Sequence, residues 1–168
     1  MPTINEKSKE TFEISYDNYF KTRFTRIIEI IRAFSPIIGK KDVLEKLTRL
    51  SEKRSVEMIE NQLESLKPIT NFEEFKEIYK EQISTEFMQH CSSFVIVEDT
   101  PKKLSLKFTE CLWANTFLEM NASDIGYPMC CYPDFAMAKA YHPNIKLIRT
   151  KTLMQGNDYC NHTYIWED

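Results

Sequence analysis

Glycine is scarce in this chain of 168 residues, and the motifs that depend on it are missing. The three glycines form no Gly-x-x-x-x-Gly-Lys loop, no Gly-x-Gly-x-x-Gly turn and no Gly-x-Ser-x-Gly elbow. Because a backbone cradle around phosphate needs glycine where the chain approaches the ligand closely, nucleotide chemistry is disfavoured.

Long apolar runs and a basic excess are also lacking. No run approaches the roughly 20 residues needed to cross a bilayer, and the N-terminal segment MPTINEKSKE is polar, without the pattern of a secretory signal. The 22 Lys and Arg residues stand against 25 Asp and Glu, which gives a net charge of −3. We therefore expect neither a membrane nor a nucleic acid as partner. The composition is compatible with a homo-oligomer.

The five cysteines are an odd number, and no export signal accompanies them. Free thiols of this kind are typical of a reducing compartment, so we expect a cytoplasmic protein. Cys130, Cys131, His142, Cys160 and His162 could together supply four zinc ligands. Their spacing lacks both a Cys-x₂₋₄-Cys and a His-x₃₋₅-His pair, so we expect no metal, and no cofactor is indicated.

The density of charge divides the chain near residue 90. Residues 1–90 hold 31 charged side chains, whereas residues 91–168 hold 16 together with all five cysteines. Apolar side chains recur at helical spacing in the front part, over residues 12–31, 42–66 and 72–87. Alternating or β-branched runs predict strands behind it, at residues 94–97, 104–108, 145–153 and 159–166, with short helices at 111–120 and 133–141 and a loop at 121–132.

This order of elements predicts an α+β fold. We expect residues 1–168 to form a single domain in which N-terminal helices pack on a mainly antiparallel sheet of about four strands, with short helices between the strands. The helical front (1–90) would cover the apolar face of the sheet. Any functional site would lie in the sheet-containing part (91–168).

Arg149 is the only arginine after residue 90, and it shares a strand face with Ile145. If the aliphatic side chains of this strand point inward, the guanidinium does so too. A buried guanidinium is costly unless it meets a carboxylate. That carboxylate belongs either to the protein, at Asp124, Asp134 or Asp158, or to a ligand held by the planar fork.

Cysteines on other elements could line the same pocket. Cys160 and His162 share a face of the last strand, but roughly 7 Å between such side chains is long for a direct hydrogen bond. Cys111 would begin a helix, where exposed N–H groups lower a thiol's pKa, and Cys131 enters another helix. The alternative for each is ordinary packing, as for Cys111 beside Trp113.

Four pieces of the second part carry a family resemblance: CLWANTF at 111–117, CYPD at 131–134, HPN at 142–144 and RTKTLMQGNDYC at 149–160. They resemble the L-2-amino-thiazoline-4-carboxylic acid hydrolase family, whose name describes opening a cyclic isothiourea with water. The family's usual Cys-Asp-Phe ending is Cys160-Asn161-His162 here, which removes a carboxylate and adds an imidazole. A weaker likeness is to small-molecule-binding domains of the four-vinyl-reductase type.

The resemblance implies a hydrolase for a C–N bond in a small cyclic amidine carrying a carboxylate. The catalytic candidates are Cys111, Cys131, Asp134 and His162, and the substrate-binding candidates are Arg149, Cys160, Asp158 and Trp113. Two routes stay open: a thiolate attacks the amidine carbon while Asp134 holds its nitrogens, or Asp134 or His162 deprotonates water directly. A non-catalytic ligand-binding or sensor domain, and an interaction protein that acts through its helical front, are the competing functions.

Overall fold

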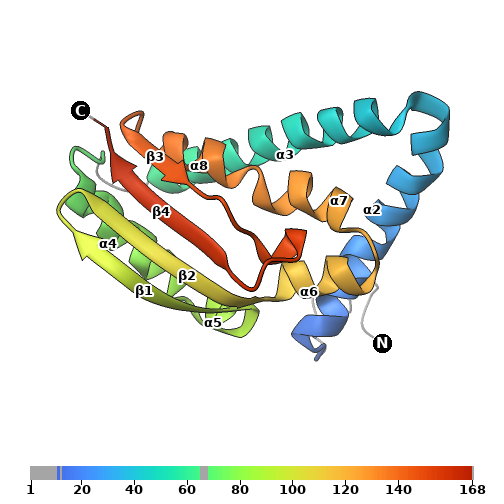
Figure 1. Cartoon of the computed structure of the whole chain (residues 1–168), viewed down its shortest axis with the longest axis horizontal. Helices are drawn as coiled ribbons and strands as arrows, with labels where there is room; N and C mark the ends of the chain where they lie inside the picture. Colours follow the sequence, from blue (N-terminus) through green and yellow to red (C-terminus); the bar gives the residue numbers. More distant parts are fainter. Residues whose placement is uncertain (1–10, 12, 65–67, 168) are drawn as a thin grey trace, which may run out of the picture.

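The computed structural model of the chain describes residue 11 and residues 13–64 and 68–167 (Figure 1). Its helices are α2 (Tyr16–Ile38), α3 (Lys40–Leu63), α4 (Phe72–Ile83), α5 (Glu86–Cys91), α6 (Leu112–Glu119), α7 (Ser123–Gly126), the π-helix η1 (Tyr127–Cys131), α8 (Asp134–Tyr141) and the 3₁₀-helix η2 (Leu153–Gln155). Its strands are β1 (Ser92–Thr100), β2 (Lys103–Cys111), β3 (Ile145–Ile148) and β4 (Cys160–Trp166). The first predicted helix begins at residue 12 and the second ends at residue 66. Both of these residues lie outside the described residues.

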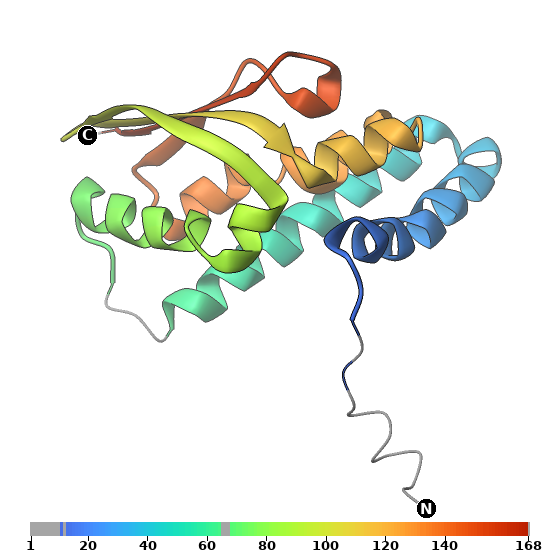
Figure 2. The ribbon, with the colours of Figure 1, turned by 90° about the horizontal axis from the view of Figure 1, so that it is seen from below.

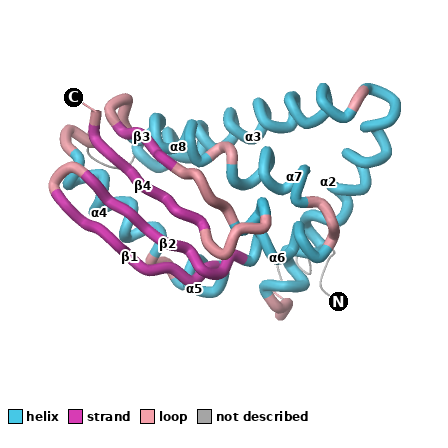
Figure 3. Tube along the Cα trace, viewed as in Figure 1, coloured by secondary structure: helices cyan, strands magenta, loops and turns pink. Residues whose placement is uncertain are grey.

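The four strands form one antiparallel sheet in the order β1-β2-β4-β3. Seen edge-on, α3, α4 and α5 lie on the same side of this sheet (Figure 2), and the colouring by secondary structure separates the strands from the long helical hairpin of α2 and α3 (Figure 3). The predicted α+β class, with N-terminal helices and an antiparallel sheet, is confirmed.

The register of the sheet decides which side chains meet under the helices. Cys160 of β4 lies opposite Phe108 of β2, and His162 lies opposite Leu106. On the other side of β4, Leu147 pairs with Tyr164. Because side chains alternate between the two faces, these residues all project toward the helices. Arg149 follows Leu147 by two residues, and His162 precedes Tyr164 by two, so the antiparallel register places Arg149 beside His162.

Two clusters of buried apolar side chains hold the helices in place. In the first, Ile59 of α3 and Phe75 of α4 are buried together with Leu106 of the sheet. In the second, Phe24 of α2 packs with Phe117 of α6. Burying one such side chain contributes about 1.5–3 kcal/mol to stability. The front helices and the sheet share these buried contacts.

The first turns of the front helices are fixed by side-chain caps. Ser15 Oγ accepts a hydrogen bond from the Asn18 N–H at 3.2 Å, and Asn71 Oδ1 accepts one from the Glu74 N–H at 3.0 Å. Thr85 Oγ1 caps α5 in the same way. Residues 72–87, predicted as one helix, are therefore two, because the chain leaves α4 at Ile83 and starts again after Thr85.

Residues 123–131 are helical, inside the segment 121–132 that the sequence predicted as a loop. Here α7 runs into η1, in which the Tyr132 N–H donates to the Tyr127 carbonyl at 2.8 Å, the longer step of a π-helix. Pro128 lies in this continuous helical segment, just after the step from α7 to η1, so one backbone N–H is missing where the helical step lengthens. Proline and glycine in this segment therefore shape a helix rather than prevent one.

Strand β3 is shorter than the predicted range 145–153. It ends at Ile148, and the next backbone donors leave the ladder for a side chain. Asn161 Oδ1 accepts hydrogen bonds from the N–H groups of Thr150 at 3.0 Å and Lys151 at 2.7 Å. An amide on β4 thus takes the place of the strand pairing that alternation alone would predict.

Candidate functional site

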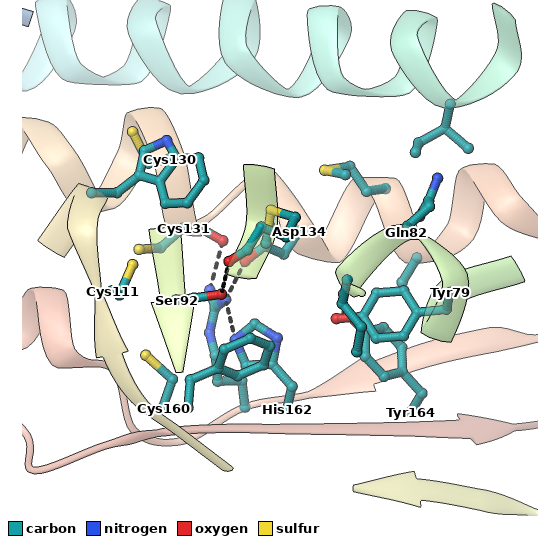
Figure 4. Close-up of a pocket in the computed structure, with 18 of the residues that line it drawn as sticks. Tyr79, Gln82, Ser92, Cys111, Cys130, Cys131, Asp134, Cys160, His162 and Tyr164 are labelled. Atoms are coloured by element: carbon teal, nitrogen blue, oxygen red, sulfur yellow. Dashed lines mark hydrogen bonds and ion pairs between the residues drawn. The ribbon is translucent and has the colours of Figure 1, made fainter. Parts of the chain in front are cut away.

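A cavity of about 410 Å³ lies between the helices and the sheet. Figure 4 shows its two ends, with a group of thiols at one and tyrosines at the other. The residues that the figure labels are Tyr79, Gln82, Ser92, Cys111, Cys130, Cys131, Asp134, Cys160, His162 and Tyr164. Arg149 and Trp113 also line the cavity, whereas Asp158 is not among its lining residues. Seven of the eight candidates from the sequence therefore share one cavity.

Arg149 is buried in the wall of the cavity, with only 1% of its side chain exposed. Its Nη1 donates to Asp134 Oδ2 at 2.5 Å, and its Nη2 donates to the Cys131 carbonyl at 2.6 Å. The ring of Phe135 lies 4.9 Å from the guanidinium carbon. Of the three carboxylates that the sequence offered, Asp134 is the partner, while Asp124 pairs with Lys40.

The unusual helix η1 and the start of α8 create this arrangement. Asp134 is the first residue of α8, where the N–H groups at the helix start favour a carboxylate. The Cys131 carbonyl lies at the end of η1, where the π-helical step changes which backbone groups pair within the helix. It accepts the hydrogen bond from Arg149. Asp134 and the Cys131 carbonyl thus each accept a hydrogen bond from one of the two terminal nitrogens of the buried guanidinium.

Asp134 sits where its two protonation states are close in free energy. Burial raises the pKa of its carboxyl group to about 6 from the ordinary 3.8, and the charge of Arg149 opposes that shift. The side chain is 26% exposed, on the cavity side. A carboxyl group with a pKa near neutrality can take up and return a proton, as general acid–base catalysis requires.

His162 is a neutral imidazole beside this ion pair. Burial and the charge of Arg149 lower its pKa to about 3. Its Nε2 lies 3.3 Å from Arg149 Nη1, and a guanidinium only donates, so Nε2 accepts and the proton belongs on Nδ1. Among the described residues, neither His162 Nδ1 nor Arg149 Nε has a hydrogen-bond partner, although both are buried. Two unsatisfied donors therefore stand at this end of the cavity.

The four thiols at the same end are protonated. Burial raises the pKa of Cys111 to about 11 and that of Cys130 to about 12. It raises the pKa of Cys131 and Cys160 as well, and the Leu153 N–H, 3.1 Å from Cys160 Sγ, opposes the latter shift. The N–H groups at the start of α6 do lower the pKa of Cys111, as the sequence predicted, but desolvation outweighs them.

The far end of the cavity is polar but already paired. Tyr164 donates its hydroxyl to that of Tyr79 at 3.0 Å, Tyr141 donates to Gln82 Oε1, and the Gln82 amide donates to Gln62 Oε1. No residue of this end was among the site candidates from the sequence. The apolar stripe of the third helix gave a signal for Tyr79 as a core residue, but none marked the two glutamines.

Of the residues weighed as zinc ligands, all but His142 line the cavity, but they are not arranged to hold a metal ion. His142 stacks on Trp166 with a centroid distance of 4.5 Å, and it does not line the cavity. Across residues 11, 13–64 and 68–167, no group of three or more His, Cys, Asp or Glu side chains is arranged to hold a metal ion. The absence of zinc stays a prediction.

The altered family position points away from the cavity. Asn161 alternates with Cys160 and His162 along β4, and its side chain binds the backbone of Thr150 and Lys151 instead. An aspartate there would accept the same two N–H groups. The carboxylate that this chain lacks would therefore not have faced the cavity, whereas the imidazole of His162 lines it.

Comparison with known proteins identifies the family of the chain. The sequence model of the L-2-amino-thiazoline-4-carboxylic acid hydrolase family matches residues 17–164, and the chain belongs to that family. The match includes the helical front as well as the segments that line the cavity. No curated protein matches the chain. Within the described residues, no helix has both the length and the apolar character needed to cross a membrane.

Proposed function

We propose that the protein is a small-molecule hydrolase that cleaves a C–N bond in a cyclic amidine or isothiourea bearing a carboxylate, such as 2-amino-thiazoline-4-carboxylate. The observation that carries this proposal is Asp134, a carboxyl group with a pKa near neutrality that lines a cavity beside a buried arginine. Family membership supports hydrolysis as the reaction class.

The direct-water route fits the protonation states best. Asp134 accepts a proton from a water molecule as the water oxygen adds to the amidine carbon, which gives a tetrahedral adduct. This proton passes from Asp134 to the ring nitrogen of the adduct, and Asp134 then accepts the proton of the adduct's hydroxyl group as the carbonyl forms and the ring C–N bond breaks. The second proton also passes to the departing nitrogen, which becomes the free amine. Water is thus consumed in full, and the product is a carbamoyl-cysteine. Arg149 holds Asp134 Oδ2, so the second carboxylate oxygen is the one we assign to the proton transfer.

The covalent route has less support. Attack on the amidine carbon needs a thiolate, and burial keeps Cys111 and Cys131 as thiols at neutral pH. We assign these side chains, with Cys160 and Trp113, to the wall that shapes the substrate pocket. His162 acts as a hydrogen-bond donor through Nδ1 rather than as a base, because its pKa is too low for it to hold a proton in exchange with water.

The direct test is to incubate the full-length protein with 2-amino-thiazoline-4-carboxylate and to measure carbamoyl-cysteine and cysteine. Asp134→Asn keeps an oxygen that accepts from Arg149 but removes the base, so turnover should fall about 10²–10⁴-fold. Asp124→Asn is the matched control, because Asp124 pairs with Lys40 away from the cavity. Turnover by Asp134→Asn at the wild-type rate would exclude the proposed mechanism.

A non-catalytic ligand-binding or sensor domain is the second candidate. The observation that favours it is the ion pair itself, since Arg149 already holds Asp134 and none of the four cavity thiols is ionised. Such a domain would bind the thiazoline acid without product formation, which the same incubation combined with calorimetry would reveal. For either candidate we propose a cytoplasmic location, because all five cysteines are free.

A further inference from the structure

The cavity is larger than the substrate for which the family is named. 2-Amino-thiazoline-4-carboxylate has about nine non-hydrogen atoms, and at most about 30 Å³ for each, the share of a water molecule in the liquid, gives about 270 Å³. The cavity holds about 410 Å³. Even this generous measure leaves about 140 Å³, which is room for about five further atoms.

The cavity contains apolar and adaptable side chains in its wall. Met58 and Ile59 of α3 line it together with Met88 of α5 and Met137 of α8. Methionine side chains are flexible and polarisable, so they adjust to ligands of different shape. Met58 is 54% exposed while its neighbour Ile59 is buried, which places the rim of the cavity at this turn of α3.

The polar groups are distributed unequally along the cavity. At the tyrosine end, the hydroxyl of Tyr79 and the amide of Gln82 are satisfied by hydrogen bonds within the protein. At the other end, Arg149 Nε and His162 Nδ1 are buried donors without partners among the described residues. A buried unpaired donor costs about 1–3 kcal/mol, so an acceptor from a ligand is favoured most strongly at that end. The ligand therefore has one polar head.

We propose that the ligand of this cavity is a carboxylic acid with an apolar tail of about five carbons or more, whose carboxylate lies at Arg149 and His162 and whose tail runs along the methionine wall toward Met58. This inference rests on the proposed function for its reacting head group, and it narrows the substrate to a larger, tailed member of that class. The two unpaired donors fix the orientation, because only the head can satisfy them.

Calorimetric titration of the full-length protein with butanoic, hexanoic, octanoic and decanoic acid tests the proposal. Affinity should rise about fourfold for each methylene until the tail fills the cavity, and then level off or fall. The corresponding primary amides should bind at least about tenfold more weakly, because they lose the charge that faces Arg149. Arg149→Lys should lower the affinity for the acids but not for the amides, and it keeps a cation beside Asp134 so that the fold is maintained.

A variant in the methionine wall locates the tail. Met88→Trp narrows the cavity and should lower octanoate affinity about tenfold while butanoate binds as before. Glu86→Trp adds the same side chain to the exposed side of α5 and is the matched control. Equal effects of the two variants, or equal binding of acids and amides, would mean adsorption elsewhere and would overturn the inference.

The two proposals fail in different ways. If affinity does not depend on chain length while the thiazoline acid is hydrolysed, the tail inference is wrong and the hydrolase stands. If the series shows the expected rise while the thiazoline acid gives no product, the ligand class is supported and the proposed hydrolysis of that acid is wrong.

Discussion

Acidification should destabilise the protein through His162. The folded-state pKa of this imidazole is about 3, lowered from the ordinary 6.5 by burial and by Arg149, so the unfolded chain binds the proton first as the pH falls. Its contribution to stability is fully present above about pH 6.5 and is lost progressively toward pH 3. Each pH unit in that window is worth about 1.4 kcal/mol, or about 3 kcal/mol between pH 6.5 and pH 4.

Asp134 affects the dependence of folding stability on pH with the opposite sign. Its folded-state pKa is raised to about 6, above the ordinary 3.8, so the folded protein binds this proton first. The carboxyl group therefore adds stability as the pH falls from about 6 to about 4. The two contributions nearly cancel in that range, and the pH profile of the wild type alone cannot separate them.

The comparison of the wild type with His162→Gln isolates the imidazole. Glutamine does not titrate, and its Oε1 can accept from Arg149 as Nε2 does. Urea unfolding followed by tryptophan fluorescence at a series of pH values should show the variant gaining about 3 kcal/mol relative to the wild type by pH 4. His90→Gln, at an exposed position, is the control. A difference that stays constant with pH within about 0.5 kcal/mol would refute a buried neutral His162.

Four further predictions rest on single features. Gly126→Ala should cost about 1–3 kcal/mol in thermal unfolding, because the added Cβ would lie 2.6 Å from Met154 Sδ; an unchanged midpoint would contradict this. Cys111 and Cys131 should react with iodoacetamide more slowly than free cysteine at neutral pH, and faster labelling would restore the covalent route. Residues 91–168 alone should not give a cooperatively unfolding product, because the front helices complete their core. Elemental analysis should find no stoichiometric zinc, and one zinc per chain would overturn that expectation.

Local pattern predicted the sheet side of the site because a strand has only two faces. The alternation that buries Ile145 also buries Arg149, and the same rule places Cys160 and His162 together on the last strand. The structure adds the register, which no single strand contains. The register of β3 against β4 places the two inward faces side by side, so that Arg149 contacts His162.

The rest of the site depends on tertiary packing. The π-helical step that presents the Cys131 carbonyl to Arg149 lies in a segment whose proline and glycine favour a loop by local rules. The reactivity predicted for Cys111 depends on its place at a helix start, yet desolvation by distant elements has the larger effect on its pKa. Burial is a property of the assembled fold, so local sequence alone is a poor guide to the direction in which a thiol's pKa is shifted.

Asn161 shows how a departure from a family pattern can leave the chemistry unchanged. Asn161→Asp restores the family's carboxylate, and its oxygens can accept from Thr150 and Lys151 as the amide does. Because this side chain faces away from the cavity, turnover of the thiazoline acid and binding of the acid series should change less than about twofold, and stability by less than about 0.5 kcal/mol.

Asn161→Leu has nearly the same size but leaves two backbone donors without their acceptor, so it should cost about 1–3 kcal/mol. It should also loosen the segment that follows Arg149, and so weaken ligand binding. Urea unfolding and the acid titrations measure both effects. A change in turnover of tenfold or more in Asn161→Asp, with unchanged stability, would show that a carboxylate at this position reaches the reacting atoms, and the assignment of the proton transfer to Asp134 alone would be wrong.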